Sequence, residues 1–237
     1  MKAILLAAGR GTRISRMVEA VPKSTLPING VPLIRHTVEL LASHGIECVV
    51  CVGYQKDKVF DALKGVDVKY CVNPFYNVTN SIASLWFAKE NLDDDMIILN
   101  ADVFFSSEIL SMILDNPNDV VVAIDKSRIE VGDYFFATTD NGCISKYGKD
   151  LPLEERSCEY VGICKVEKAF VPEFVNQLDK LVYDGQYQLW WENVLYSMTN
   201  DRNIYTVDVD GNFWSEIDYF DDYERILRYI EKENVNE

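Results

Sequence analysis

The chain is short of positive charge. Its 237 residues include 23 Lys and Arg against 38 Asp and Glu, which gives a formal net charge of -15 at pH 7. Surfaces that hold nucleic acid need clustered Lys and Arg to meet the phosphate backbone. We therefore expect no nucleic-acid partner, and an anionic small substrate would have to meet a local pocket of basic residues.

Long apolar runs are also missing. No apolar stretch approaches the roughly 20 residues of a membrane-spanning helix, so no membrane insertion is expected. The first apolar stretch, Ala3 to Ala8, is shorter than the apolar region of a secretory signal peptide and runs straight into a glycine motif. Together these absences predict a cytoplasmic protein.

Cysteines in metal-binding patterns are scarce. Six cysteines are scattered through apolar segments, and Cys48 and Cys51 alone have the C-x-x-C spacing. Val49 and Val50 separate them, so the pair lies in a continuous apolar run typical of a buried strand. Buried thiols with a structural role in a reducing compartment are the expectation.

Length and apolar content suit a single α/β domain over 1–237, because 48% of the residues are hydrophobic and one sizeable core can form. Short apolar runs alternate with segments of helical spacing, and this alternation predicts a mostly parallel sheet flanked by helices. Strands are expected over 2–8, 48–52, 66–72, 96–99, 120–125 and 205–209. Helices are expected over 32–44, 57–64, 80–90, 107–114, 171–181, 190–198 and 219–233.

A different pattern occupies about 131–166. Its short alternating segments and turns, such as Asp140-Asn141-Gly142, predict a small antiparallel insertion over the active site. In open parallel sheets the ligand crevice lies outside the carboxyl ends of the strands. The segment Gly9 to Arg13 and the side chain of Asp102 both follow predicted strands, so we expect them to meet at that edge.

The strongest motif is Leu-Ala-Ala-Gly-Arg-Gly-Thr-Arg at 6–13, followed by Pro-Lys-Ser at 22–24. Glycines let backbone amides approach phosphate oxygens, and Arg13 and Lys23 supply charge that offsets a triphosphate. A simple turn between strand and helix would explain Gly9 and Gly11 but neither basic residue. The spacing matches neither a Walker loop nor the G-x-G-x-x-G of dinucleotide folds.

With these residues, the sequence resembles the sugar-phosphate and choline-phosphate nucleotidyltransferase superfamily from Met1 to Tyr223. The resemblance implies a Rossmann-like fold in which Arg13 and Lys23 are catalytic. It also implies an in-line reaction, in which a substrate phosphate oxygen attacks the α-phosphorus of a nucleoside triphosphate and pyrophosphate leaves. The nucleotide-binding residues implied for the first loop are Leu6, Ala7, Ala8, Gly9, Gly11 and Thr12.

The same resemblance implies that Asp102 and Asp218 bind Mg²⁺. Two carboxylates suit this cation, which prefers oxygen ligands and usually bridges protein carboxylates to substrate phosphates. Each aspartate could instead cap a helix. A non-catalytic nucleotide-binding module would be expected to lose such residues, yet Arg13, Lys23 and both aspartates are present.

Within the superfamily the sequence is most similar to the bacterial choline-phosphate cytidylyltransferases, through Asn80-Ser81, Ser84, 190–193 and 211–218. This implies CTP as the nucleotide and a small phosphorylated amino alcohol, phosphocholine first, as the acceptor. Asn80, Ser81 and Ser84 would lie near the base, although Asn80-Ser81 could also be a helix cap. The sequence does not predict an oligomeric state.

A trimethylammonium group is bound by aromatic faces and a carboxylate. The side chains implied for this task are Tyr187, Trp190, Trp191 and Glu192, and the alternative is that the paired tryptophans are packing. Further candidates for acceptor binding are Glu159, Tyr160 and Glu216. Glu159 to Gly162 partly matches a sugar-binding stretch, so a sugar-1-phosphate nucleotidyltransferase is the alternative function.

Overall fold

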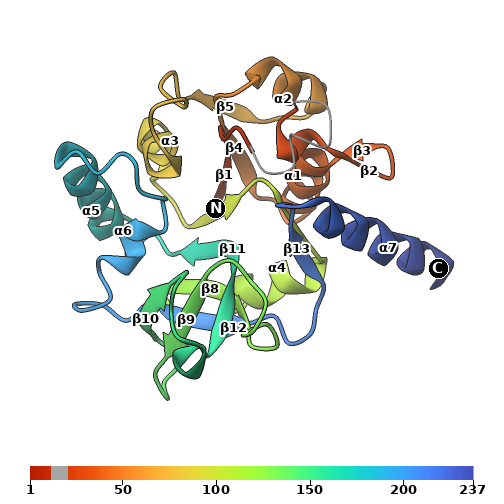
Figure 1. The fold of residues 1–237 in the computed structure, drawn as a ribbon. Helices are drawn as coiled ribbons and strands as arrows, with labels where there is room; N and C mark the ends of the chain where they lie inside the picture. The colour runs from red at the N-terminus through yellow and green to blue at the C-terminus, as the bar shows by residue number, and fades with distance from the viewer. Residues whose placement is uncertain (12–20, 237) are drawn as a thin grey trace.

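The computed structural model describes residues 1–11 and 21–236 and confirms the expected α/β fold (Figure 1). Within these residues nine strands form one sheet, with the order β10-β9-β11-β6-β1-β4-β5, and β8 pairs with both β11 and β12. The strands are β1 (Lys2–Ala7), β4 (Glu47–Val52), β5 (Lys69–Val72), β6 (Met96–Asn100), β8 (Val120–Asp125), β9 (Phe135–Thr138), β10 (Ile144–Gly148), β11 (Cys158–Val166) and β12 (Tyr205–Asp208).

Helices cover both faces of this sheet. They are α1 (Leu33–Ser43), α2 (Lys56–Ala62), α3 (Ser81–Phe87), α4 (Ser107–Leu114), α5 (Val171–Tyr183), α6 (Asn193–Tyr196) and α7 (Phe220–Asn236). Alternate side chains of each strand point to opposite faces. Ile4 of β1 therefore belongs to the hydrophobic cluster that includes residues of α3, α5 and α6, whereas Leu5 belongs to the cluster that includes residues of α1, α2 and α4. No helix among the described residues is long and apolar enough to span a bilayer.

The parallel part of the sheet comprises β5, β4, β1 and β6. Lys2 of β1 lies opposite Glu47 of β4 on one side and Met96 of β6 on the other. These strands therefore run in step, and their carboxyl ends come together at one edge. Gly9 and Asp102, which follow β1 and β6, are brought to this edge as the sequence predicted.

The antiparallel region expected over about 131–166 is present, and it is joined to the main sheet. Strands β9 and β10 form a hairpin, and β9 pairs with the first residues of β11. Strand β11 is buried along its whole length and runs antiparallel to β6, from Ile163 opposite Leu99 to Val166 opposite Met96. The central sheet is therefore mixed.

Two short ladders were not predicted. Strands β2 (Pro27–Ile28) and β3 (Val31–Pro32) form a hairpin, and β7 (Val103–Phe105) pairs with β13 (Trp214–Glu216). Helix α7 begins four residues after the end of β13, and its Ile226 belongs to one hydrophobic cluster with Ile28 of β2. The helix extends away from the sheet in Figure 1. The expected helix over 190–198 is shorter than predicted, since only Asn193–Tyr196 is helical.

Gly162 in β11 has a conformation that a side chain would strain. Its φ is +94°, and an added Cβ would lie 2.8 Å from Cγ2 of Val103. We expect Gly162→Ala to lower the free energy of unfolding by about 3 kcal/mol, because backbone strain and overpacking add. Denaturant unfolding measures this change. Gly45→Ala is the matched control, since Gly45 has φ +71° with open space around it, and an equal loss in both variants would contradict the packing argument.

Candidate active site

A cavity of about 290 Å³ opens at the carboxyl ends of the parallel strands. Ala8 and Gly9 after β1, Asp102 after β6 and the start of α3 all contribute to its lining. A smaller cavity of about 60 Å³ lies next to it and shares Leu6, Gly9 and Asp102. The two cavities together form an elongated site with chemically different ends.

The smaller cavity has the features of a phosphate pocket. It is lined by Ala7, Gly11, Lys23 and Ser24 besides the shared residues. Gly11 has φ +54°, and an added Cβ would lie 2.7 Å from Cγ of Lys23, so the lysine stem passes where a side chain at residue 11 would lie. The bare backbone and the ammonium group thus face the same small space, as anion binding requires.

Lys23 lies between two aspartates. Its Nζ donates to Oδ1 of Asp218 and lies 3.4 Å from Oδ2 of Asp102. Burial by itself lowers the pKa of Lys23, but the charges of Asp102 and Asp218 outweigh it, so the pKa lies above its usual value. The ammonium group is therefore charged at neutral pH.

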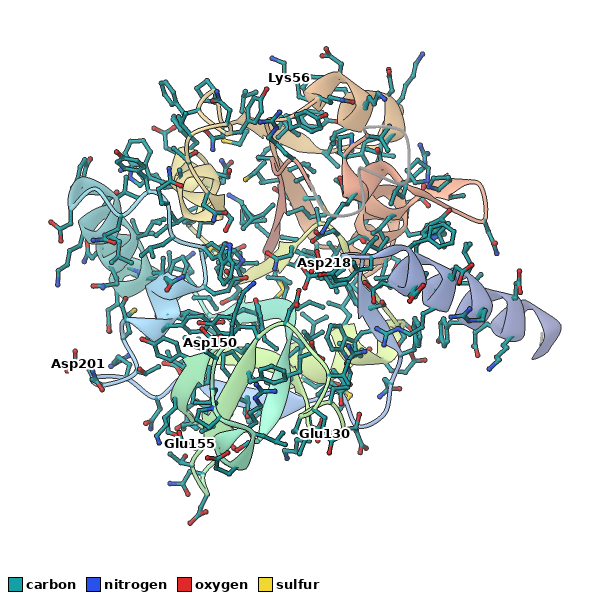
Figure 2. The ribbon with its side chains drawn as sticks, viewed as in Figure 1. Lys56, Glu130, Asp150, Glu155, Asp201 and Asp218 are labelled. Atoms are coloured by element: carbon teal, nitrogen blue, oxygen red, sulfur yellow. The ribbon has the colours of Figure 1, made fainter. Side chains whose placement is uncertain are left out.

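The β7–β13 ladder brings these aspartates together from positions far apart in the sequence. Glu216 pairs with Val103, and the main-chain N–H of Ile217 donates to the carbonyl of Asp102 at 3.0 Å. Asp102 and Asp218 thereby flank the ladder on the same side as Lys23. Figure 2 places Asp218 at the centre of the molecule, at the start of α7, whereas Glu130, Glu155 and Asp201 lie at its rim.

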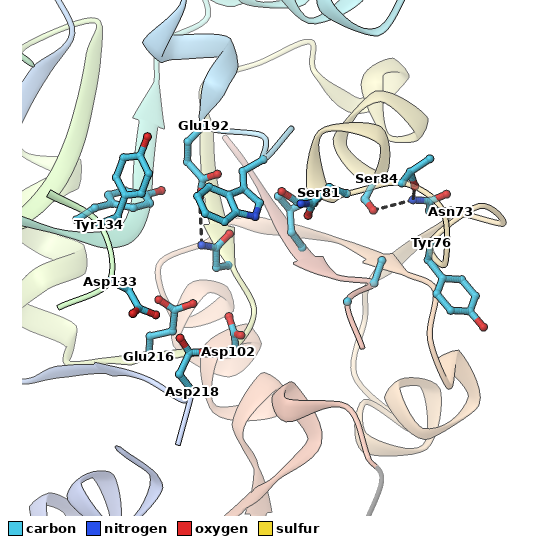
Figure 3. A pocket seen from close by; sticks show the side chains of 18 of the residues that line it. Asn73, Tyr76, Ser81, Ser84, Asp102, Asp133, Tyr134, Glu192, Glu216 and Asp218 are labelled. Carbon is cyan, nitrogen blue, oxygen red and sulfur yellow. Dashed lines mark hydrogen bonds between the residues drawn. The ribbon is translucent and has the colours of Figure 1, made fainter. Parts of the chain in front are cut away.

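Two further carboxyl groups, Glu216 and Asp133, complete an acidic wall beside Asp102 and Asp218 (Figure 3). Burial raises the pKa of Glu216 well above its usual value, and the charges of Asp102 and Asp218 raise it further. The raised pKa of Glu216 reflects the cost of placing a further negative charge beside Asp102 and Asp218. A cation or an ammonium-bearing substrate would relieve the repulsion.

The donor set at this wall fits a hard metal ion that substrate helps to bind. Among residues 1–11 and 21–236, no three His, Cys, Asp or Glu side chains are gathered closely enough to hold a metal alone. Mg²⁺ usually takes one or two carboxylates together with substrate phosphates and water. Asp102 and Asp218 both converge on the ammonium of Lys23, which shows that their oxygens face one shared cation position.

Glu192 is the main charged group at the other end of the larger cavity. Nδ2 of Asn100 donates to its Oε1 at 3.2 Å, and the indole N–H of Trp191 donates to Oδ1 of Asn100 at 3.0 Å. Burial raises the pKa of Glu192 to about 7, although the hydrogen bond from Asn100 stabilises the charged form. A buried carboxylate held in this way is ready to receive a cation.

Aromatic rings stand beside Glu192. Tyr134 packs edge-on against Trp190 with ring centroids 5.8 Å apart, and it stacks on Tyr196 at 5.4 Å. The ammonium nitrogen of Lys149 lies 4.4 Å from the centroid of the Trp190 ring. The face of Trp190 therefore already attracts a cation, which is the interaction that aromatic boxes offer to quaternary ammonium groups.

Comparison with known proteins agrees with this geometry. A family model described as the MobA-like NTP transferase domain matches residues 3–189. The chain belongs to this nucleotidyltransferase family. The expected membership is thus confirmed.

Individual relatives are similar over nearly their full length. The choline-phosphate cytidylyltransferase of Streptococcus pneumoniae is 28% identical, and the match covers 99% of this chain and 100% of that protein. The CTP:phosphoglutamine cytidylyltransferase of Campylobacter jejuni is 27% identical, with 94% and 98% covered. A solved structure of the CTP:phosphocholine cytidylyltransferase from Streptococcus pneumoniae has a TM-score of 0.79 at 23% identity, covering 97% of this chain and 98% of that one, which shows a shared fold.

Most of the residues expected from the sequence lie around the two cavities of this nucleotidyltransferase. Those that line the larger cavity are Leu6, Ala8, Gly9, Asn80, Ser81, Ser84, Asp102, Tyr160, Trp190, Glu192, Glu216 and Asp218. Ala7, Gly11 and Lys23 line the smaller one. The remaining members of the first loop, Thr12 and Arg13, lie outside the described residues.

Three expected acceptor-binding residues lie elsewhere. Trp191 is fully buried and supports Asn100, so of the two adjacent tryptophans it is Trp190 that faces the cavity. Tyr187 is exposed and lies outside the cavity lining. Glu159 is buried in an ion pair with Arg128 and accepts the main-chain N–H of Asp133 at 3.0 Å, so its carboxylate holds a loop in place.

Several cavity residues were missed by sequence reasoning. Asn73 directly follows β5 and Asn100 ends β6, so the rule that polar residues at strand ends line the site would have found both. Tyr134 and Lys149 lie in the region 131–166, where no local pattern marks the residues that face the site. Tyr196 is in α6 and lines the cavity, where its ring stacks on that of Tyr134.

Proposed function

We propose that this nucleotidyltransferase is a cytidylyltransferase. It transfers CMP from CTP to a small phosphorylated amino alcohol, with phosphocholine the first candidate, and releases pyrophosphate. The observation that carries this proposal is that a phosphate pocket in the smaller cavity adjoins the larger cavity, which is lined by Glu192 and Trp190. Two relatives aligned over nearly their full length are named for CTP-dependent transfer to phosphorylated compounds, which supports the choice of CTP.

The chemistry requires positioning and charge stabilisation. An oxygen of the acceptor phosphate forms a bond to the α-phosphorus of CTP, and the bond from that phosphorus to the bridging oxygen breaks as pyrophosphate leaves in line. Lys23 faces the phosphate pocket and Lys149 lies at the acceptor end, so one ammonium group is available to each anionic partner. Fixed charges of this kind stabilise the transition state without reorganising.

Mg²⁺ is part of this proposal, with Asp102 and Asp218 as its protein ligands. When bound, it would neutralise charge on the phosphates and help to align them. Lys23 would then turn from the two carboxylates towards the triphosphate. The gathering of carboxyl groups at the acidic wall supports this assignment, since Glu216 and Asp133 lie beside the two proposed ligands.

The alternative function, transfer to a sugar 1-phosphate, has less support from the described residues. Glu159, the residue expected to contact the sugar, instead forms an ion pair with Arg128 and accepts the main-chain N–H of Asp133. A neutral sugar would also leave the buried carboxyl group of Glu192 without a charged partner. The cationic acceptor is therefore the better fit to the acceptor end.

Glu192 gives the proposal a pH signature. Its pKa of about 7 means that the side chain is neutral below this pH and negatively charged above it. We expect KM for phosphocholine to fall about tenfold between pH 6 and pH 8 as the carboxylate forms, consistent with the strength of a desolvated charge interaction. In Glu192→Gln this fall should disappear, and a variant that kept the wild-type profile would contradict the assignment.

The test of the proposed function is Mg²⁺-dependent pyrophosphate release from CTP, UTP, dTTP, ATP and GTP. Each nucleotide is paired with phosphocholine, phosphoethanolamine, 2-aminoethylphosphonate and glucose 1-phosphate. Turnover with CTP and an amino-alcohol phosphate or phosphonate supports the proposal. Turnover with glucose 1-phosphate alone would overturn it.

A further inference from the structure

Asn73 is a buried side chain that neither the sequence motif nor the mechanism uses. It follows β5 at the carboxyl edge of the sheet, is 1% exposed, and its main-chain N–H donates to the carbonyl of Val52 at 2.9 Å. The N–H of Phe75 donates to its side-chain Oδ1 at 2.9 Å. Because a main-chain N–H needs an acceptor, this bond fixes which end of the amide is oxygen and which is nitrogen.

The amide nitrogen of Asn73 donates both of its hydrogens. Nδ2 donates to Oγ1 of Thr79 at 3.1 Å and to Oγ of Ser84 at 3.0 Å. The hydroxyl of Thr79 in turn donates to the carbonyl of Phe75 at 2.8 Å. Asn73 therefore links the loop that carries Tyr76 to helix α3 by hydrogen bonds. One of these bonds is accepted by the hydroxyl oxygen of Ser84.

Ser84 is left with its hydrogen to donate. It is 3% exposed, it lines the larger cavity, and Figure 3 shows it bonded to Asn73 beside Tyr76. Ser81, three residues earlier on the same helix, is prepared in the same way, because its Oγ accepts the main-chain N–H of Trp191 at 2.9 Å. Both hydroxyl groups line the larger cavity, and among the described residues neither donates its hydrogen to a protein acceptor.

Asn80 differs from these serines. Its Oδ1 accepts the N–H of Ser81 at 2.8 Å and its Nδ2 donates to the carbonyl of Gln188 at 3.3 Å. The side chain is the N-cap of α3, as the alternative in the sequence analysis held. Base contact from this part of the helix therefore depends on Ser81 and Ser84.

Paired donors discriminate between pyrimidines. Cytosine presents two neighbouring acceptors, N3 and O2, whereas uracil and thymine carry an N–H at position 3. A site built to hydrogen-bond one pattern rejects a ligand that leaves its polar groups unpaired. We propose that Asn73 is a positioning residue for nucleotide selectivity: it sets Ser84 as a hydrogen-bond donor, and Ser84 with Ser81 selects cytosine over uracil. This inference rests on the proposed use of CTP.

The decisive variant is Asn73→Asp. A carboxylate at this position keeps the acceptor for the N–H of Phe75 but has no hydrogens to give. Ser84 would then donate its hydrogen to residue 73 and present lone pairs to the ligand, which suits the N–H of uracil. We expect the ratio of Kd for Mg·UTP to Kd for Mg·CTP to fall at least about tenfold in this variant, since each lost hydrogen bond is worth about tenfold in affinity.

Titration calorimetry with each Mg·nucleotide alone measures this ratio without an acceptor. Ser84→Ala should lower the ratio, and adding Asn73→Asp to Ser84→Ala should lower it no further, because the effect passes through Ser84. The control is Asn116→Asp, since the side-chain oxygen of Asn116 likewise accepts a main-chain N–H two residues later, that of Asn118, in a loop that does not line the cavity.

The outcomes separate the two proposals. A wild-type preference for CTP that Asn73→Asp and Ser84→Ala both leave unchanged overturns this inference, and so does independent, additive loss in the double variant. Selective CTP binding without turnover of any amine-bearing acceptor overturns the proposed function and leaves the role of Asn73 standing. A wild-type protein that binds UTP as tightly as CTP overturns both the inference and the choice of nucleotide.

Discussion

Lys23→Met is expected to lower kcat about a thousandfold, in line with the loss of a charge aimed at the transition state. Methionine keeps an unbranched stem of similar length in the space that Gly11 leaves open, so the phosphate pocket keeps its shape. The loss of the ammonium removes the positive charge that faces the triphosphate. It also leaves Asp102 and Asp218 without their shared cation until a metal binds.

Steady-state kinetics at saturating Mg²⁺ and substrates measures this effect. Lys165→Met serves as the control, because Lys165 is also buried and donates to a carbonyl, that of Asn116, outside the site. It should change stability and leave kcat within about threefold of wild type. A Lys23→Met enzyme that kept a tenth or more of the wild-type kcat would contradict a role for this ammonium in the chemical step.

Asp102→Asn and Asp218→Asn are expected to lower kcat/KM about a hundred- to a thousandfold, because each removes one carboxylate from the proposed metal site. The Mg²⁺ concentration for half-maximal activity should rise at least about tenfold in both variants. High Mg²⁺ should restore part of the activity lost in these two variants, whereas it should not restore the activity lost in Lys23→Met. A titration of activity against Mg²⁺ at fixed CTP distinguishes the two kinds of defect.

Asp179→Asn is a matched control for these aspartates. Asp179 in α5 is partly buried to a similar degree as Asp102 and pairs with Lys89 at 2.8 Å, so the substitution removes an ion pair of comparable exposure away from the cavity. It should leave the Mg²⁺ dependence unchanged. If Asp102→Asn shows the same Mg²⁺ dependence as this control, Asp102 is not a metal ligand.

The regular elements of this fold could be predicted because each carries its own local signal. The apolar runs of β1, β4, β6 and β8 mark buried strands, and the spacing of apolar residues in α1 and α5 marks helices. The β7–β13 ladder could not be found in this way. Each strand has three residues, and the partners lie more than a hundred positions apart in the sequence. Their pairing depends on the packing of the whole sheet.

The candidate site was predictable where its residues belong to one local motif or follow a strand. The glycine loop, Lys23 and Asp102 are of this kind, and the structure brings them together. Which side of a segment faces the cavity was not predictable. Trp190 and Trp191 are adjacent in sequence, yet one lines the cavity and the other is fully buried. The side chain of Glu159 points into an ion pair for the same reason, since tertiary contacts decide its direction.

The acceptor end shows how distant segments share one task. Glu192 takes its position from Asn100 at the end of β6, and Asn100 is held by the indole of Trp191. Tyr134 and Lys149 come from the antiparallel region and reach the same cavity wall. A cation-binding end therefore needs β6, the segment around 190 and the 131–166 region to be folded together, and no one of these segments predicts it.

The measurement that tests the central claim most directly is the ratio of kcat/KM for phosphocholine to that for glucose 1-phosphate, with CTP and Mg²⁺, in the wild type and in Glu192→Gln. The account predicts a wild-type ratio of about a hundred or more, which Glu192→Gln lowers at least about tenfold by removing the buried charge. A wild-type preference for glucose 1-phosphate, or a ratio that Glu192→Gln leaves unchanged, would contradict it.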